Sequence, residues 1–151
     1  MKKLLLIVMF LQLSVANALV PVQGTNNEIR HTIERFYQSL NANDFKSAAQ
    51  VTTQDWEHVT SSGRWLRGQE AVIRDIQGVG PIHRDHFVIE DIQVRRTGQE
   101  SALVIVTGYK SAADGLGGVT EAYDKQISTF VVVRRKTGWL IAHDHTSEGH
   151  E

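Results

Sequence analysis

The hydrophobic pattern changes its period near the middle of the chain, and this change limits the folds that the chain can adopt. In the first half, apolar residues recur at helical spacing. The first such stripe consists of Ile29, Ile33, Phe36, Tyr37 and Leu40. Thr25 and Glu28 form a capping-box pattern that predicts the start of this helix. Asp44 predicts the cap of a second helix over residues 45–51, and a third is predicted over residues 69–76.

In the second half, apolar residues follow the shorter period of β-strands. The predicted strands are residues 87–94, 102–110, 123–135 and 139–147. Gly98 and Gly138 lie in short predicted turns, and a glycine-rich connection covers residues 111–120, so we expect an antiparallel meander. Helices followed by a meander predict an α+β fold with the helices on one face of a curved sheet.

The order of these parts resembles a known superfamily. A helix containing IRHTIERFYQSLNANDF precedes DWEHVTSSGRWLRGQEAVIRDI, and the chain closes with GWLIAHDHTS. This arrangement is similar to the nuclear-transport-factor-2-like (NTF2-like) proteins. Within them it resembles the SnoaL-like group and the association domain of calcium/calmodulin-dependent kinase. The resemblance implies a cystatin-like cone: an antiparallel sheet wrapped around the N-terminal helix, two further short helices, an open end and frequent homodimers.

The first 18 residues have the layout of a signal peptide. Lys2 and Lys3 precede an apolar run over residues 4–15, and Ala16-Asn17-Ala18 supplies small residues at a cleavage site. The run is shorter than the roughly 20 residues that cross a bilayer. We therefore predict cleavage after Ala18, one domain over residues 19–151, and a periplasmic or secreted product with no membrane attachment after cleavage. The alternative is a buried N-terminal helix or strand.

Composition limits the partners that we expect. The chain has no cysteine and a net charge of −1, and its densest basic stretches are Arg95-Arg96 and Arg134-Arg135-Lys136. Both stretches follow predicted strands, where solvated charges are common, so we expect no nucleic-acid partner. No phosphate loop, dinucleotide fingerprint, serine elbow or cysteine nucleophile is present. We accordingly expect no cofactor and a small-molecule ligand of unknown identity.

The last predicted strand carries two candidate site residues. In an extended strand, His143 and His145 lie on one face with Trp139 and Ile141, and Asp144 lies on the other face. Both faces become polar toward the strand end, so we expect that end at the mouth of the cone. Histidine suits proton transfer near neutral pH, and we predict His143 as a catalytic base and His145 as a ligand contact. The alternatives are hydrogen bonding to loops, or a metal site completed by His58 or the stretch His83-Arg84-Asp85-His86; no metal site is predicted.

A second predicted wall covers residues 55–65. His58 is a second candidate base there, and Trp56 and Trp65 are candidate substrate contacts. Further candidates are Tyr37, Tyr109 and Gln126, whose polar groups can bind a ligand if they point inward. For each of them, ordinary packing with a local hydrogen bond is the alternative.

The sequence departs from the better-known enzymes of this superfamily. Ketosteroid isomerases place a catalytic aspartate before a glycine where this chain has Val59-Thr60-Ser61-Ser62-Gly63, and a second acid near Phe130. Three hypotheses remain: a pocket protein that binds a small, partly apolar molecule; a lyase or isomerase with a histidine base and Tyr109 or His145 polarising oxygen; and a homodimeric assembly domain using Val131, Val133, Leu140 and Ala142.

Overall fold

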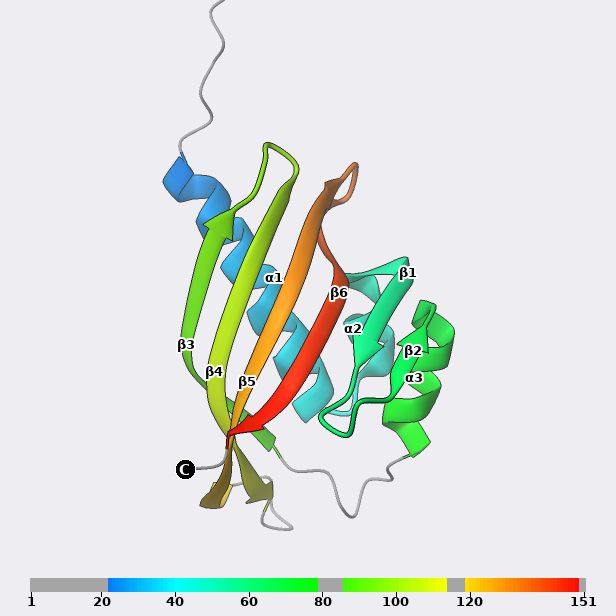
Figure 1. Cartoon of the computed structure of the whole chain (residues 1–151), viewed down its shortest axis with the longest axis vertical. Coiled ribbons are helices and arrows are strands. Elements are labelled where there is room, and N and C mark those ends of the chain that lie inside the picture. The colour runs from blue at the N-terminus through cyan, green and yellow to red at the C-terminus, as the bar shows by residue number, and fades with distance from the viewer. Residues whose placement is uncertain (1–21, 79–85, 114–118, 150–151) are drawn as a thin grey trace, which may run out of the picture.

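The computed structural model describes residues 22–78, 86–113 and 119–149. They form an α+β fold in which a six-stranded curved sheet lies over a long helix (Figure 1). The helices are α1 (Val22–Asn41), α2 (Phe45–Gln50) and α3 (Gln69–Gly78). The strands are β1 (Thr52–Val59), β2 (Trp65–Arg67), β3 (His86–Arg96), β4 (Ser101–Ala113), β5 (Val119–Arg135) and β6 (Gly138–Gly149). The predicted signal peptide lies outside the described residues and stays a prediction.

The strand order in the sheet is β2-β1-β6-β5-β4-β3. The stretch β3-β4-β5-β6 is the predicted antiparallel meander, which is confirmed. The sheet also contains one parallel pair, β1 with β6, so it is not antiparallel throughout. This pairing matters for the site because it joins the first half of the sequence to its last strand. In Figure 1, α1 crosses behind β3–β6, while α2 and α3 lie beside β1 and β2.

Helix α1 supplies one wall of the core. Its buried stripe is Ile29, Ile33, Phe36 and Tyr37, which packs against the inner face of the sheet. The helix begins at Val22, one turn before the predicted start. The prediction that Thr25 and Glu28 form a capping box is therefore wrong. Thr25 is buried inside the helix instead, because the helical stripe extends one turn toward the N-terminus. The predicted cap of α2 is confirmed: Asp44 accepts a hydrogen bond from the Ser47 amide at 3.0 Å.

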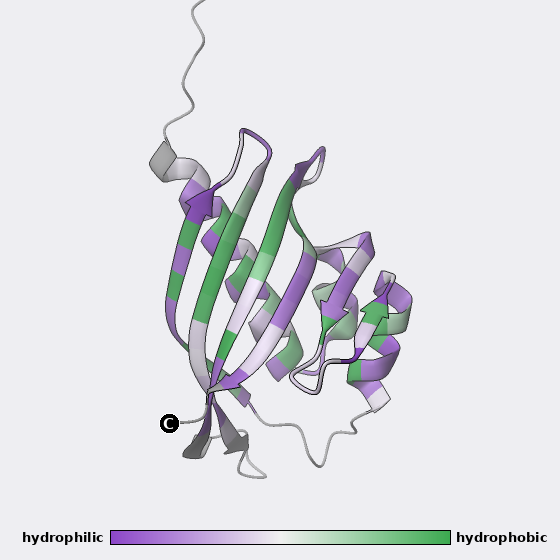
Figure 2. Cartoon of the chain, in the orientation of Figure 1, coloured by the Kyte–Doolittle hydropathy of each residue, from purple (hydrophilic) through white to green (hydrophobic). Residues whose placement is uncertain are grey.

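The inner face of the sheet is apolar at one end and polar at the other. The apolar end contains Ala102, Val104, Phe130, Val132 and Ile141, all buried. Further along the same strands, the inward positions are Gln126, Ser128 and Asp144. Figure 2 shows this gradient along β4 and β5 as a change from green to white and purple. Since α1 and the apolar end fill the core, the polar end is left to line a cavity.

No helix within the described ranges is both long and apolar enough to cross a membrane. Helix α1 spans 20 residues, but its exposed side carries His31, Glu34 and Arg35, and it is amphipathic rather than apolar throughout.

Candidate functional site

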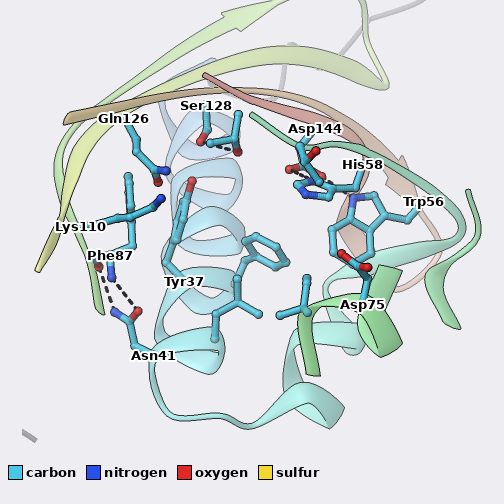
Figure 3. Close-up of a pocket in the computed structure, with 15 residues that line it drawn as sticks. Tyr37, Asn41, Trp56, His58, Asp75, Phe87, Lys110, Gln126, Ser128 and Asp144 are labelled. Carbon is cyan, nitrogen blue, oxygen red and sulfur yellow. Dashed lines mark hydrogen bonds and ion pairs between the residues drawn. The ribbon is translucent and has the colours of Figure 1, made fainter. Parts of the chain in front are cut away.

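A cavity of about 350 Å³ opens at the polar end of the inner sheet face (Figure 3). Its apolar lining comes from α1, α3, β1 and β3, and its polar lining comes mainly from β1, β4, β5 and β6. The apolar members are Phe36, Leu40, Trp56, Ile76 and Phe87. A cavity with apolar walls and a few converging polar groups is the usual form of a small-molecule site.

His58, Asp144 and Trp56 form the centre of this site. The parallel pairing of β1 with β6 sets His58 directly beside Asp144, with both side chains on the inner face. His58 Nδ1 lies 2.7 Å from Asp144 Oδ2, and Trp56 Nε1 donates to Asp144 Oδ1 at 2.7 Å. The side chain of Asp144 is only 4 % exposed, and that of His58 is 16 % exposed. The carboxylate is therefore desolvated but bonded through both oxygens, as a buried charge requires.

These bonds define the proton arrangement on His58. The Trp56 indole is always a donor, and an ionised carboxylate only accepts, so Nδ1 of His58 is the donor in the second bond. A neutral imidazole protonated at Nδ1 carries its lone pair on Nε2. Among the described residues, none forms a hydrogen bond with Nε2 of His58, and the ring lines the cavity. The arrangement can hold a histidine base in one tautomer and stabilise the cation formed when it takes a proton.

Tyr37 lies across the cavity from this pair. Its ring stacks on Phe87 with centroids 4.3 Å apart, and it meets Phe130 edge-on. Burial raises the pKa of the Tyr37 phenol well above its usual range, a hydrogen bond with Ser128 opposes the rise, and the charge of Asp144 adds to it. Tyr37 therefore keeps its proton and remains a hydrogen-bond donor at physiological pH.

Three further polar side chains line the cavity. Gln126 and Lys110 project from β5 and β4 toward Tyr37 in Figure 3. The Lys110 ammonium lies 3.2 Å from Glu148 Oε1. Asn41, at the end of α1, bonds both backbone groups of Phe87, with Nδ2 donating to the carbonyl at 2.9 Å and Oδ1 accepting from the amide at 3.0 Å. These bonds fix β3 to the helix end and hold the Phe87 wall in place.

On the other side of the cavity, Asp75 of α3 faces the same space. It pairs with Arg64 of the β1–β2 turn and is about a third exposed. Asp75 is thus a partly solvated carboxylate that already has a cation, unlike the enclosed Asp144.

The structure brings together four of the eight predicted site residues. Tyr37, Trp56, His58 and Gln126 all line the cavity. The other four lie elsewhere: Tyr109, His143 and His145 are not among the lining residues, and Trp65 is 56 % exposed on β2 with the Arg67 guanidinium 3.9 Å from its ring centre. Tyr109 pairs with Val88 across β4 and β3, on the face opposite to Lys110 and Phe87.

The predicted sharing of one face by Trp139, Ile141, His143 and His145 is wrong because β6 contains a bulge. Ile141 pairs with Val132 and His143 pairs with Val131, so Ala142 is an extra residue in β6. An extra residue reverses the alternation beyond it. Trp139 and Ile141 consequently face the core, His143 faces outward, and Asp144 takes the inward position.

Outside the cavity, His143 has a partner of its own. Its Nδ1 lies 3.7 Å from Glu57 Oε2, and both side chains are about one third exposed. Within the described part of the chain, no three His, Cys, Asp or Glu side chains group as metal ligands. His83 and Asp85, considered above as further ligands, lie outside the described residues.

Sequence reasoning missed Asp144, Ser128 and Lys110, all of which line the cavity. A regular strand places Asp144 on the face with Leu140 and Ala142, which hid its inward position. One signal was available in the sequence: Asp144 lies between two histidines in a strand that begins with Trp139 and Ile141. Burying a carboxylate in such a strand costs free energy unless the carboxylate has hydrogen-bond partners.

The curved sheet packed over α1 defines a protein of the cystatin-like, NTF2-like fold. Residues 29–149 match the SnoaL-like domain, and the chain belongs to this family. This confirms the resemblance and the fold class that the sequence predicts. No curated protein matches the chain.

Several solved structures share the fold. A protein of unknown function from Mycobacterium tuberculosis is 15 % identical, with a TM-score of 0.75 over 89 % of this chain and 79 % of its own. ActVI-ORFA from Streptomyces coelicolor is 16 % identical, with a TM-score of 0.74 over 85 % of this chain and 99 % of its own. An NTF2-like protein from Streptomyces avermitilis, provisionally described as a dehydratase, is 18 % identical. Its TM-score is 0.72 over 85 % of this chain and 99 % of its own.

Proposed function

We propose that this protein binds a small, partly apolar molecule in the cavity and transfers a proton on it, with His58 as the general base. The reaction class is that of a lyase or isomerase acting on a carbonyl or hydroxy compound. The observation that carries the proposal is the bond between His58 Nδ1 and Asp144 Oδ2, which leaves Nε2 for a substrate. The provisional dehydratase assignment of the S. avermitilis protein agrees with this class.

The cavity supports the other requirements of such a reaction. Phe36, Trp56 and Phe87 offer apolar and aromatic surface to the substrate body. Tyr37 and Ser128 offer hydroxyl groups to a substrate oxygen, and Tyr37 stays protonated for that task. In this scheme, Nε2 of His58 takes a proton from carbon beside the carbonyl, and the enolate oxygen accepts a hydrogen bond from Tyr37. In a lyase, the enolate re-forms the carbonyl as the bond to the β-hydroxyl breaks, and the hydroxyl takes the proton from His58 and leaves as water. In an isomerase, His58 returns the proton at another carbon.

Proton exchange with solvent tests this proposal before the natural substrate is known. The purified protein is incubated in D₂O with a panel of small cyclic and aryl ketones and β-hydroxy ketones, and loss of the α-proton signal is followed by ¹H NMR. We expect catalysed exchange on at least one compound. His58→Gln should reduce the rate by about 10²-fold or more, which is the usual contribution of a positioned base.

His143→Gln is the matched control, because it removes a histidine from the other face of the same strand pair. Its exchange rate should equal that of the original protein. Equal rates for His58→Gln and the original protein would rule out His58 as the base. Binding of panel compounds in the cavity without exchange of any of them would leave a ligand-binding protein without this chemistry.

Export and dimer formation stay predictions. For the dimer, the outward residues Val131, Val133 and Leu140 are half-buried in the single chain, and Ile127 is 42 % exposed beside them on β5. This apolar outer face supports the assembly hypothesis, which does not compete with the cavity because the two lie on opposite faces of the sheet.

A further inference from the structure

A second cavity, of about 620 Å³, lies at the other end of the domain. It is bounded by α1, the end of α2 and the turn between β5 and β6, and it shares no lining residue with the proposed active site. The proton-transfer chemistry proposed above makes no use of it.

The lining of this cavity is strongly basic. It contains Arg35 from α1, Arg134 and Arg135 from the end of β5, and Lys136 from the turn that follows, against Glu28 as its one acidic lining residue among those described. The whole chain has a net charge of −1, so the concentration of cations is local and does not follow from composition. The fold creates it, because α1 brings Arg35 beside a turn about 100 residues later in the sequence.

No close ion pair neutralises these cations among the described residues, although the charge of Arg135 acts on the Asp55 carboxylate. Arg134 approaches Glu28 only to 3.8 Å, with both side chains about half exposed. Such an exposed ion pair contributes little to stability, so another anion can readily replace the Glu28 carboxylate. Arg35 and Lys136 form no ion pair with another described residue. A positive potential therefore remains at the cavity, as is typical of surfaces that attract anions.

Trp139 adds a second, independent observation. It lines this cavity, it is 4 % exposed, and its indole Nε1 is buried with no hydrogen-bond partner. Leaving a buried donor unpaired is destabilising. The guanidinium groups of Arg96 and Arg134 lie 4.8 and 5.9 Å from the indole ring centre. An anion bound in the cavity would lie beside this indole ring and the Arg134 guanidinium.

We propose that this cavity binds a phosphate group, as inorganic phosphate or as part of a phosphorylated molecule. Arginine guanidinium groups match phosphate oxygens with paired N–H donors. Phosphate fits better than a carboxylate because it carries up to two negative charges and so uses more of the excess positive charge. The site is separate from the proposed active site and does not depend on its chemistry.

Phosphate titration with NMR detection of the indole groups tests the site directly. The protein has three tryptophans, so an ¹⁵N-labelled sample gives three indole N–H resonances, and Trp139→Phe identifies one of them. Sodium phosphate is added at constant ionic strength, with sodium chloride as the balancing salt. We expect saturable movement of the Trp139 resonance with no comparable movement of the other two.

Arg134→Gln/Arg135→Gln is the test variant, and Arg74→Gln/Arg95→Gln is its control. Both remove two exposed arginines, but neither control position lines the cavity. We expect phosphate affinity to fall at least tenfold in the first variant and to stay within twofold in the second. A Trp139 resonance that does not respond to phosphate would overturn the proposal, and so would equal losses in both variants. Because the substituted side chains are exposed, the remaining amide spectrum should be unchanged and reports that each variant is folded.

Vesicles then distinguish a lipid headgroup from a free phosphate compound. Once the phosphate titration is positive, co-sedimentation with phosphatidylglycerol vesicles that is lost in Arg134→Gln/Arg135→Gln identifies a headgroup. No co-sedimentation identifies a free phosphorylated ligand. Vesicle binding without any phosphate response of Trp139 would instead indicate attraction to a charged surface and would overturn the cavity site.

Discussion

Two histidine–carboxylate pairs lie side by side on β1 and β6, on opposite faces of the same sheet. Inside, His58 and Asp144 are 2.7 Å apart, and Trp56 also donates to Asp144. Outside, His143 and Glu57 are 3.7 Å apart and about one third exposed. The two pairs occupy successive register positions of one parallel ladder, Glu57 with His143 and His58 with Asp144.

The two pairs contain the same kinds of residue but differ in their access to water. Residue type alone therefore does not determine how tightly the geometry of a pair is constrained. Water can solvate both members of the outer pair in many arrangements, so their geometry is weakly constrained and their interaction is worth little. The inner carboxylate has almost no access to water, so each of its oxygens needs a donor and the geometry becomes unique. We infer that only the inner pair is rigid enough to hold a catalytic tautomer.

The largest expected effect comes from Asp144→Asn. An amide at this position can still accept from Trp56 through its oxygen, but its NH₂ group then faces His58 Nδ1 and favours the tautomer protonated at Nε2. That tautomer cannot accept a proton at the cavity, so we expect the exchange rate to fall by about 10³-fold or more. The same ¹H NMR assay in D₂O measures it.

Glu57→Gln is the matched control for this change, since it neutralises the carboxylate of the outer pair. Exchange should stay within twofold of the original rate, because the outer pair is solvated and points away from the cavity. A comparable loss in both variants would show that the two faces of the sheet do not differ in function.

A smaller effect is expected on stability from Trp56→Phe. The change keeps an aromatic ring in the core but removes the donor to Asp144 Oδ1, so a buried carboxylate oxygen loses its partner. We expect the free energy of unfolding to fall by about 2–3 kcal/mol from the unpaired oxygen and the lost volume together. Urea denaturation followed by far-UV circular dichroism measures it.

Trp65→Phe makes the same replacement at an exposed tryptophan on the neighbouring strand β2. Its cost should be within about 0.5 kcal/mol, as for most surface changes. If both variants lost the same stability, the hydrogen bond from Trp56 to Asp144 would make no measurable contribution to the stability of the protein.

The sequence predicted the fold well because that prediction depends on summed, local patterns. The apolar stripe of Ile29 and Ile33 and the alternation of β4 each rest on many residues, so one error changes little. The start of α1 was placed wrongly because the capping box at Thr25 is a short motif that a helix can run through. The parallel pairing of β1 with β6 was not predicted, since nothing local in either strand specifies a partner so distant in the sequence.

The site was predicted only in part, for two physical reasons. Tyr37 and Trp56 were found because their positions follow from regular elements that the core already defines. His143 was preferred over Asp144 because a strand was taken as regular, while a single bulge at Ala142 exchanges the two faces. A bulge depends on how β5 and β6 fit together, and no residue in GWLIAHDHTS encodes it alone.

The smallest expected effect concerns Tyr37, on the wall opposite the inner pair. Its pKa in the folded protein is raised, mainly by burial, so the folded state holds this proton more tightly than the unfolded state. The stabilisation is complete below the ordinary tyrosine pKa of about 10 and is lost as the pH rises above it. At pH 10.5, Tyr37→Phe should therefore leave the phenolate absorbance of the native protein at 295 nm unchanged, whereas in urea it should remove the contribution of one tyrosine. A loss of native absorbance in the variant would mean that Tyr37 ionises in the fold, and the wall facing Asp144 would then be as solvated as the outer pair.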